Sequence, residues 1–175
     1  MSEQANTDFS TLKMLIMDVD GVLTDGVIIV NSDGSESRRF SVLDEHRIKM
    51  WQRAGLLCAV ISGKESECTS IFAERLGIEY VMQGSKKKLE AFESLLEKSS
   101  LSFNEVAYVG DDLVDLPLVK RSGFGVAVAN AVEEVKAEAD IVTKRCGGDG
   151  AVGEVVEYIL KKRGQWDELI ERYQV

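Results

Sequence analysis

Two aspartates stand one residue apart at the end of an apolar run in LIMDVDGVLTDG, residues 15–26. Asp and Gly are common where strands end, so Asp18 and Asp20 have an ordinary interpretation as turn residues. The second interpretation is a reactive pair of carboxylates. The choice between them depends on what distant segments bring to the same place.

Further polar residues follow other apolar runs of the chain: Ser62, Gly63, Lys88, Asp111, Asp112 and Asp115. Alone, each is explained as a helix cap, a capping acid or a surface charge. Together at one edge of a sheet, crowded carboxylates are costly unless a cation compensates them. Carboxylate oxygens without histidine or thiolate partners suit Mg²⁺. A hydroxyl, a lysine and glycine amides beside that ion suit a phosphoryl group.

Six apolar runs of strand length alternate with amphipathic stretches of helix length. The runs are continuous rather than alternating, which predicts strands covered on both faces, as in a parallel sheet. We therefore predict one doubly wound, Rossmann-like α/β domain over residues 1–175, with the candidate residues at the carboxyl ends of its strands. The runs are residues 12–20, 56–62, 79–83, 106–111, 125–129 and 140–144.

Two segments depart from this alternation. Residues 27–42 predict a β-hairpin around a Ser-Asp-Gly turn, placed beside the DVDG stretch. It could be a lid, an oligomer contact or a plain surface hairpin. The tail, residues 164–175, carries Trp166, Leu169, Ile170 and Tyr173 at helical spacing. Its apolar face must cover either its own domain or a neighbouring subunit.

Composition excludes several classes of function. A net charge of -9 argues against a nucleic-acid partner. No segment reaches the roughly 20 apolar residues that cross a bilayer, and the N-terminus lacks a signal-peptide core, so we expect no membrane association and a cytoplasmic protein. Cys58, Cys68 and Cys146 are expected to be reduced, buried thiols. His46 is the only histidine, which excludes a two-histidine metal motif.

The set DVDGVLTDG, ISG, Lys88 and GDDLVDLP resembles, in order and across nearly the whole chain, the four motifs of the haloacid dehalogenase-like (HAD) phosphohydrolase superfamily. The resemblance implies that Asp18 attacks phosphorus to form an aspartyl-phosphate. Asp20 would protonate the leaving oxygen and later deprotonate the hydrolytic water. Mg²⁺ would be held by Asp18, the backbone carbonyl of Asp20 and Asp111. Asp112 and Asp115 would support this metal site. Ser62, the Gly63 amide and Lys88 would bind the phosphoryl oxygens.

No large insertion separates these motifs, so we expect the hairpin as the only lid and no cap domain. This architecture resembles the capless 3-deoxy-D-manno-octulosonate 8-phosphate (KDO 8-phosphate) phosphatases. The likeness extends through QGSKKKLEAF, GVAVANAVEEVKAEADIVTKRCGGDGAVGEVVEYIL and RGQWDELIERY. It implies Mg²⁺-dependent release of phosphate from an eight-carbon sugar acid, and a homotetramer in which a neighbouring subunit helps to close the site.

The chain also departs from that family. In VLDEHRI, residues 42–48, Leu43, Glu45 and Arg47 replace a basic residue and two glycines, and Lys64 and residues 70–72 lack the family's arginines. Lysine cannot bind a carboxylate in the bidentate manner of arginine. The alternative is therefore a related phosphatase acting on a nine-carbon sialic-acid-type 9-phosphate or another small sugar phosphate. His46 is interpreted as an exposed residue at a helix start, with substrate contact as the alternative.

Two other classes of protein fit less well. A signalling receiver domain also phosphorylates an aspartate in an α/β fold, but its acidic pair precedes that aspartate, whereas here DVDG comes first. A non-catalytic scaffold would not require Asp18, Asp20, Lys88 and Asp111 all to be present.

Overall fold

The computed structural model describes residues 7–174, and a parallel sheet forms the centre of that part of the chain. Every neighbouring pair in the sheet is parallel, in the order β5-β4-β1-β6-β7-β8. The strands are β1 (Met14–Met17), β4 (Leu57–Ile61), β5 (Tyr80–Met82), β6 (Val106–Gly110), β7 (Phe124–Ala127) and β8 (Ile141–Val142). Five of the six lie within the predicted runs, and β7 begins one residue before its run, at Phe124. This agreement confirms the doubly wound α/β fold.

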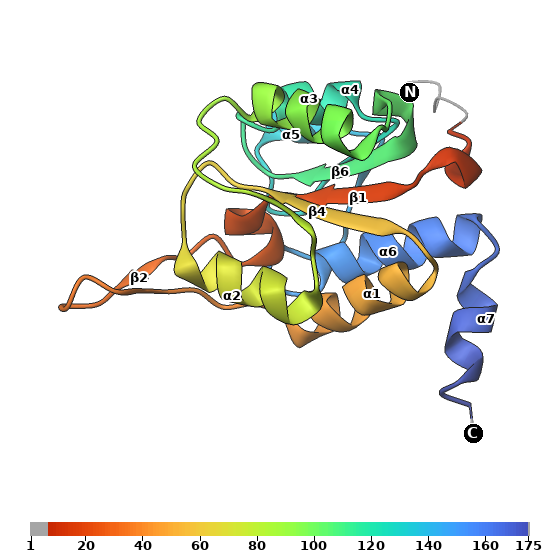
Figure 1. Ribbon diagram of the computed structural model, residues 1–175, viewed down its shortest axis with the longest axis horizontal. Coiled ribbons are helices and arrows are strands. Elements are labelled where there is room, and N and C mark those ends of the chain that lie inside the picture. The colour runs from red at the N-terminus through yellow and green to blue at the C-terminus, as the bar shows by residue number, and fades with distance from the viewer. Residues whose placement is uncertain (1–6, 175) are drawn as a thin grey trace.

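Helices cover both faces of the sheet (Figure 1). One face carries α1 (Val42–Arg53), α2 (Glu67–Leu76) and α6 (Ala151–Lys162), and the other carries α3 (Lys88–Ser99), α4 (Leu116–Arg121) and α5 (Glu133–Glu138). The chain leaves β1 for β4 and β5 on one side and returns to β6 on the other. The strand order therefore reverses between β1 and β6, which is where ligands bind in sheets of this kind.

The predicted hairpin is present as a separate antiparallel pair, β2 (Ile29–Val30) and β3 (Glu36–Ser37). It projects from the body near α2 (Figure 1). Gly34 turns the chain with a φ of 87°, in the region that favours glycine. Among the described residues, only a short turn, the hairpin and α1 separate β1 from β4, so no cap domain is inserted there.

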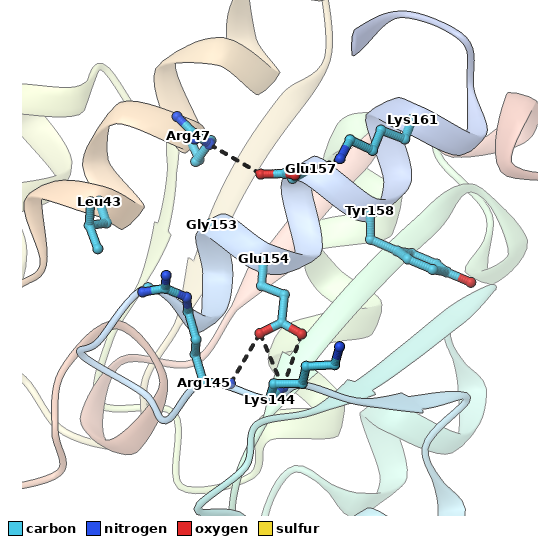
Figure 2. Close-up of a pocket in the computed structure, with 10 residues that line it drawn as sticks. Leu43, Arg47, Lys144, Arg145, Gly153, Glu154, Glu157, Tyr158 and Lys161 are labelled. Carbon is cyan, nitrogen blue, oxygen red and sulfur yellow. Dashed lines mark hydrogen bonds and ion pairs between the residues drawn. The ribbon is translucent and has the colours of Figure 1, made fainter.

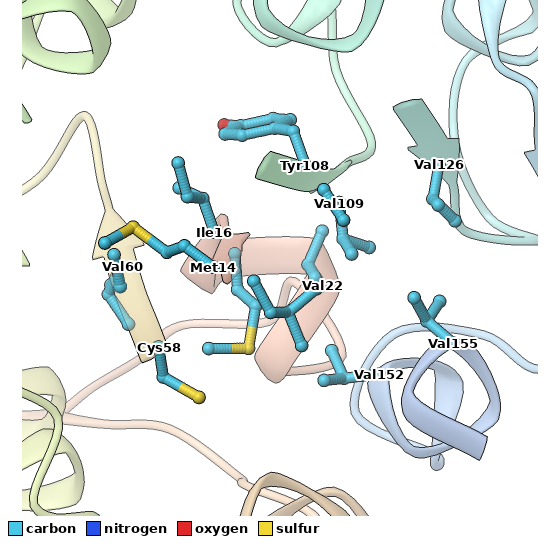
Figure 3. Close-up of a cluster of buried hydrophobic side chains, with 14 of the residues drawn as sticks. Met14, Ile16, Val22, Cys58, Val60, Tyr108, Val109, Val126, Val152 and Val155 are labelled. Atoms are coloured by element: carbon cyan, nitrogen blue, oxygen red, sulfur yellow. The ribbon is translucent and has the colours of Figure 1, made fainter. Parts of the chain in front are cut away.

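The core fixes β1 from both sides. All four residues of β1 are fully buried, and Figure 3 shows Met14 and Ile16 among side chains from the neighbouring strands and from α6. Each such aliphatic side chain contributes about 1.5–3 kcal/mol by burial. The segment that follows β1 therefore starts from a rigid support.

The tail covers its own chain. Helix α7 (Trp166–Glu171) packs Trp166 and Leu169 against the core. Beyond α7, the Tyr173 hydroxyl lies 2.9 Å from Nε2 of His46 and 2.8 Å from a guanidinium nitrogen of Arg53, both on α1. The expectation that His46 is an exposed helix-start residue was wrong, because α1 and the tail half-bury its ring. Val175, the last residue of the predicted tail, and residues 1–6 lie outside the described residues.

Two further expectations concern the cysteines and the membrane. All three cysteines are free, but only Cys58 is buried; Cys68 is half-buried and Cys146 is exposed, so the expectation of three buried thiols was wrong. None of the helices in residues 7–174 has the length and apolarity that a membrane span needs.

Candidate active site

Asp18 and Asp111 meet where the strand order reverses. Met17, the last residue of β1, lies opposite Val109 of β6, and the Asp18 N–H donates to the Val109 carbonyl at 3.1 Å. This register brings the residues after the two strands together. One carboxylate oxygen from each of Asp18, Asp111 and Asp115 lies within 4.8 Å of the others.

The side chain of Lys88 bridges two of these carboxylates. Its Nζ lies 2.7 Å from Oδ1 of Asp18 and 2.6 Å from Oδ1 of Asp115. Lys88 is the first residue of α3, and the helix presents its side chain to the sheet edge, where the side chain is only 3% exposed. The interpretation of Lys88 as a surface charge is therefore excluded.

Asp115 is surrounded by donors. Its Oδ1 also accepts from the Tyr108 hydroxyl at 2.6 Å, and its Oδ2 accepts from the backbone N–H groups of Asp111 and Asp112 at 3.1 and 3.3 Å. These bonds hold the turn after β6 in place. Asp112 itself is exposed, and its carboxylate accepts from the Leu113 N–H instead of joining the cluster.

The electrostatics reflect a crowded, dry site. Burial, followed by repulsion from Asp115, raises the pKa of Asp18 well above its usual value. The same two causes raise the pKa of Asp111 to about 6. Burial alone would lower the pKa of Lys88, but attraction to Asp18 and Asp115 outweighs burial and raises the pKa. One lysine does not balance three carboxylates.

A divalent cation fits this cluster. Oδ1 of Asp111 is buried with no hydrogen-bond partner among the described residues, although buried polar atoms are normally paired. The available donors are carboxylate oxygens, the ligands that Mg²⁺ prefers. Both oxygens of Asp115 already accept hydrogen bonds, so Asp18 and Asp111 are the side chains with oxygens to offer.

Asp20 lies beside the cluster and faces the hairpin. Its Oδ1 accepts from Nε of Arg38 at 2.8 Å. The intervening turn depends on Gly21, which has a φ of 99°, and a β-carbon there would collide with the Asp111 carboxylate. Glycine is therefore required on steric grounds as well as for its backbone angle.

Ser62 and Gly63 follow β4, the other neighbour of β1, and thus lie at the same edge of the sheet. Ser62 is only 3% exposed, and its Oγ accepts from the Lys64 N–H at 3.2 Å. Gly63 is exposed. The structure thus gathers Asp18, Lys88, Asp111 and Asp115 by contact and leaves Ser62 and Gly63 beside them.

The C-terminal part of the chain supports the turn after β1. Asn130 donates from Nδ2 to the Gly21 carbonyl at 3.0 Å and accepts from the Gly147 N–H at 2.6 Å. The Gly148 N–H donates to the Val22 carbonyl at 3.0 Å. Sequence reasoning missed these contacts and that of Arg38, because a neutral amide, glycines and one of many arginines carry no chemical signal of their own.

A separate pocket of about 460 Å³ lies between α1 and α6 (Figure 2). Arg47 approaches Glu157 there, with 3.9 Å between Nε and Oε2, and its guanidinium lies over the Trp166 ring. Glu154 accepts from the backbone N–H groups of Lys144 and Arg145. None of the predicted site residues lines this pocket. Arg47 therefore contacts Glu157 of α6 and Trp166 of α7 rather than the carboxylate cluster.

Comparison with known proteins gives the class of this chain first. The family model described as haloacid dehalogenase-like hydrolase matches residues 56–155, which include β4, α3 and β6. The parallel sheet, with carboxylates at the place where its strand order reverses, agrees with that class.

Individual relatives narrow the class. The KDO 8-phosphate phosphatase KdsC of Salmonella typhi is 39% identical over 168 residues, covering 96% of this chain and 89% of the relative. That of Escherichia coli K12 is 41% identical over 157 residues, covering 90% and 84%. The chain belongs to this family of haloacid dehalogenase-like phosphatases.

Solved structures of similar proteins agree with this family. The KDO 8-phosphate phosphatase of Moraxella catarrhalis, crystallised with magnesium, phosphate and KDO, has a TM-score of 0.92 and 39% identity, covering 94% of this chain and 95% of the other. The cobalt-bound enzyme of Haemophilus influenzae has a TM-score of 0.87 and 36% identity, covering 90% and 92%.

Proposed function

We propose that this protein hydrolyses KDO 8-phosphate to KDO and inorganic phosphate, with Mg²⁺, through an aspartyl-phosphate on Asp18. The observation that carries the proposal is the buried contact of Lys88 with Asp18 beside Asp111, at the switch point of the sheet. The similarity to KdsC proteins over most of the chain supports KDO 8-phosphate as the substrate.

Asp18 is the proposed nucleophile. Its backbone is held by β6, and its Oδ1 is held by Lys88 at 2.7 Å, so the carboxylate is fixed at the edge of the sheet. An anion attacks an anionic phosphate only when positive charge is close, and the Lys88 ammonium supplies it. Attack forms the bond from the Asp18 oxygen to phosphorus and breaks the bond to the sugar oxygen.

Asp20 is the proposed general acid and base. It would give a proton to the departing sugar oxygen and then take one from the water that hydrolyses the aspartyl-phosphate. Its position two residues after Asp18, on a turn held by Gly21 and Asn130, supports this role because the turn fixes its backbone against β1.

Asp18, the Asp20 carbonyl and Asp111 would hold Mg²⁺, with Asp115 ordering the turn. When bound, Mg²⁺ offsets carboxylate charge and stabilises charge on the phosphoryl oxygens. Ser62, the Gly63 amide and Lys88 would bind those oxygens. The unpaired Oδ1 of Asp111 and the magnesium in the Moraxella catarrhalis structure support this assignment.

A second candidate is a phosphatase for a nine-carbon sialic-acid-type 9-phosphate or another small sugar phosphate. It is favoured by the altered stretch at residues 42–48, where Arg47 turns to Glu157. Steady-state turnover of KDO 8-phosphate, a nine-carbon 9-phosphate and common sugar phosphates separates the two. If kcat/KM for KDO 8-phosphate is lower than kcat/KM for at least one other phosphate ester in the panel, the first candidate function is refuted.

We also propose a homotetramer of single-domain chains in the cytoplasm. Exposed apolar residues on and next to the hairpin support assembly: Val27, Ile29, Val30, Val42 and Leu43. Sedimentation equilibrium tests the proposal, and a monomer at micromolar concentration would refute it.

A further inference from the structure

One guanidinium group reaches the candidate active site from the hairpin. Arg38 follows β3, and its side chain is fully buried. Nε donates to Asp20 at 2.8 Å, and Nη1 donates to Glu36 at 2.8 Å. The third nitrogen, Nη2, is buried and has no hydrogen-bond partner among the described residues.

The base of the hairpin keeps Arg38 in this position. Phe40 forms an antiparallel bridge with Thr24, and its ring stacks on Phe72 of α2 with 4.1 Å between centroids. The Thr24 hydroxyl in turn accepts from the Gly21 N–H at 3.3 Å. The turn that carries Asp20 and the strand end that carries Arg38 are thus fastened together.

The shape of the guanidinium group decides where the free donor faces. Its nitrogens lie in one plane, and Nη2 shares an edge with Nε. Because Nε donates to Asp20, an N–H of Nη2 faces the same side as that carboxylate. A buried donor without a partner is unfavourable, and it gains one when a ligand oxygen arrives next to Asp20.

We propose that Arg38 is a specificity-determining residue, which donates from Nη2 to a hydroxyl oxygen of the leaving alcohol while its Nε positions Asp20. The inference rests on the proposed function, because Asp20 would protonate the ester oxygen of that same alcohol. The preferred substrates are then phosphorylated polyols, sugar acids included, with a hydroxyl on the carbon next to the ester carbon. Arg47 cannot serve instead, since it contacts Glu157 and Trp166.

The test compares two substrates on the full chain with Mg²⁺. KDO 8-phosphate has the neighbouring hydroxyl, whereas n-propyl phosphate has none, and both release an alcohol that Asp20 must protonate. In Arg38→Met, we expect kcat/KM for KDO 8-phosphate to fall roughly 10- to 100-fold more than that for n-propyl phosphate. Arg39→Met is the matched control, because the Arg39 side chain is 81% exposed, and both values should stay within about twofold. Equal losses on both substrates in Arg38→Met would reduce Arg38 to a hairpin anchor and overturn the inference.

Arg38→Lys separates the guanidinium shape from its charge. Lysine can still pair with Asp20 but lacks the second N–H on the same edge. We expect the same loss of preference for the sugar phosphate as in Arg38→Met, and a restored preference would overturn the inference. If wild-type protein hydrolyses another sugar phosphate but not KDO 8-phosphate, the proposed substrate fails. The comparison of that other substrate with n-propyl phosphate then still decides the role of Arg38.

Discussion

The ammonium group of Lys88 lies 2.6 Å from Oδ1 of Asp115, and neither side chain is more than 3% exposed. A buried pair of this kind contributes little net stability while both partners are present, but removing one strands the other in a dry site. Since Lys88 also contacts Asp18, the same ammonium group links the stability of the site to its chemistry.

We therefore expect Lys88→Met to lower the free energy of unfolding by about 3–5 kcal/mol at neutral pH and to reduce turnover strongly. Urea unfolding followed by circular dichroism measures the first effect. Lys87→Met is the matched control, because Lys87 is exposed and pairs with the exposed Glu90, and it should change neither quantity much. Similar unfolding curves for the two variants would contradict the bridging role of Lys88.

Asp18→Asn should abolish phosphate release, by roughly 10⁴-fold or more in kcat, because an amide is a poor nucleophile. The variant should be at least as stable as the wild type without metal, since it removes one negative charge from a buried cluster. Turnover assays and thermal melting check the two parts. Retained turnover would refute the nucleophile assignment.

Removal of divalent ions with EDTA should stop turnover, and added Mg²⁺ should restore it. Mg²⁺ should also stabilise the folded state, by about 2.7 kcal/mol at a concentration 100 times its Kd, because it neutralises Asp18 and Asp111. Asp111→Asn should lose both responses. An unchanged melting temperature of the wild type on titration with Mg²⁺ would count against the metal site.

Asp44 gives a pH dependence remote from the metal cluster. It is fully buried under the N-terminus of α6, where it accepts from the Gly153 and Gly150 N–H groups at 2.7 and 3.2 Å. Burial raises the pKa of Asp44 to about 6, above the unfolded value of about 3.9. The folded state therefore binds the proton more tightly, and this stabilisation is present at low pH and lost as pH rises through 6.

Between pH 8 and pH 5, the free energy of unfolding should increase by about 1.4 kcal/mol more in the wild type than in Asp44→Asn. Urea titrations of both proteins at the two pH values measure the difference. The variant serves as the control, because all other titrating groups are common to both proteins. Parallel shifts in the two proteins would show that Asp44 does not take up a proton in the folded state.

Gly21→Ala tests the turn between Asp18 and the hairpin. Gly21 and Gly34 both have positive φ angles, of 99° and 87°, but a β-carbon meets the Asp111 carboxylate at Gly21 and open space at Gly34. Gly34→Ala should cost only the backbone strain, about 1–2 kcal/mol. Gly21→Ala should cost more and should also lose turnover and the Mg²⁺ response. Unimpaired activity in Gly21→Ala would contradict the close packing of the turn on Asp111.

The sheet and the clustering of acids at its edge could be predicted from the sequence because those features leave local signals. Strands buried on both faces give continuous apolar runs, and the runs at β1 and β6 end in the acids that meet. The position of His46 was not predictable, since it depends on Tyr173 from the far end of the chain. The pairing of Asp20 with Arg38 likewise depends on how the hairpin folds back. Local patterns do not encode either contact.

The contact of Gly147 with the backbone of Gly21 joins two distant segments of the chain that leave the ribosome at different times. A nascent polypeptide stopped before residue 147 already contains Asp18, Lys88 and Asp111. It lacks Gly147 and Gly148, which contact the turn after β1. Truncated translation products should thus be inert, and catalytic competence should appear only late in synthesis.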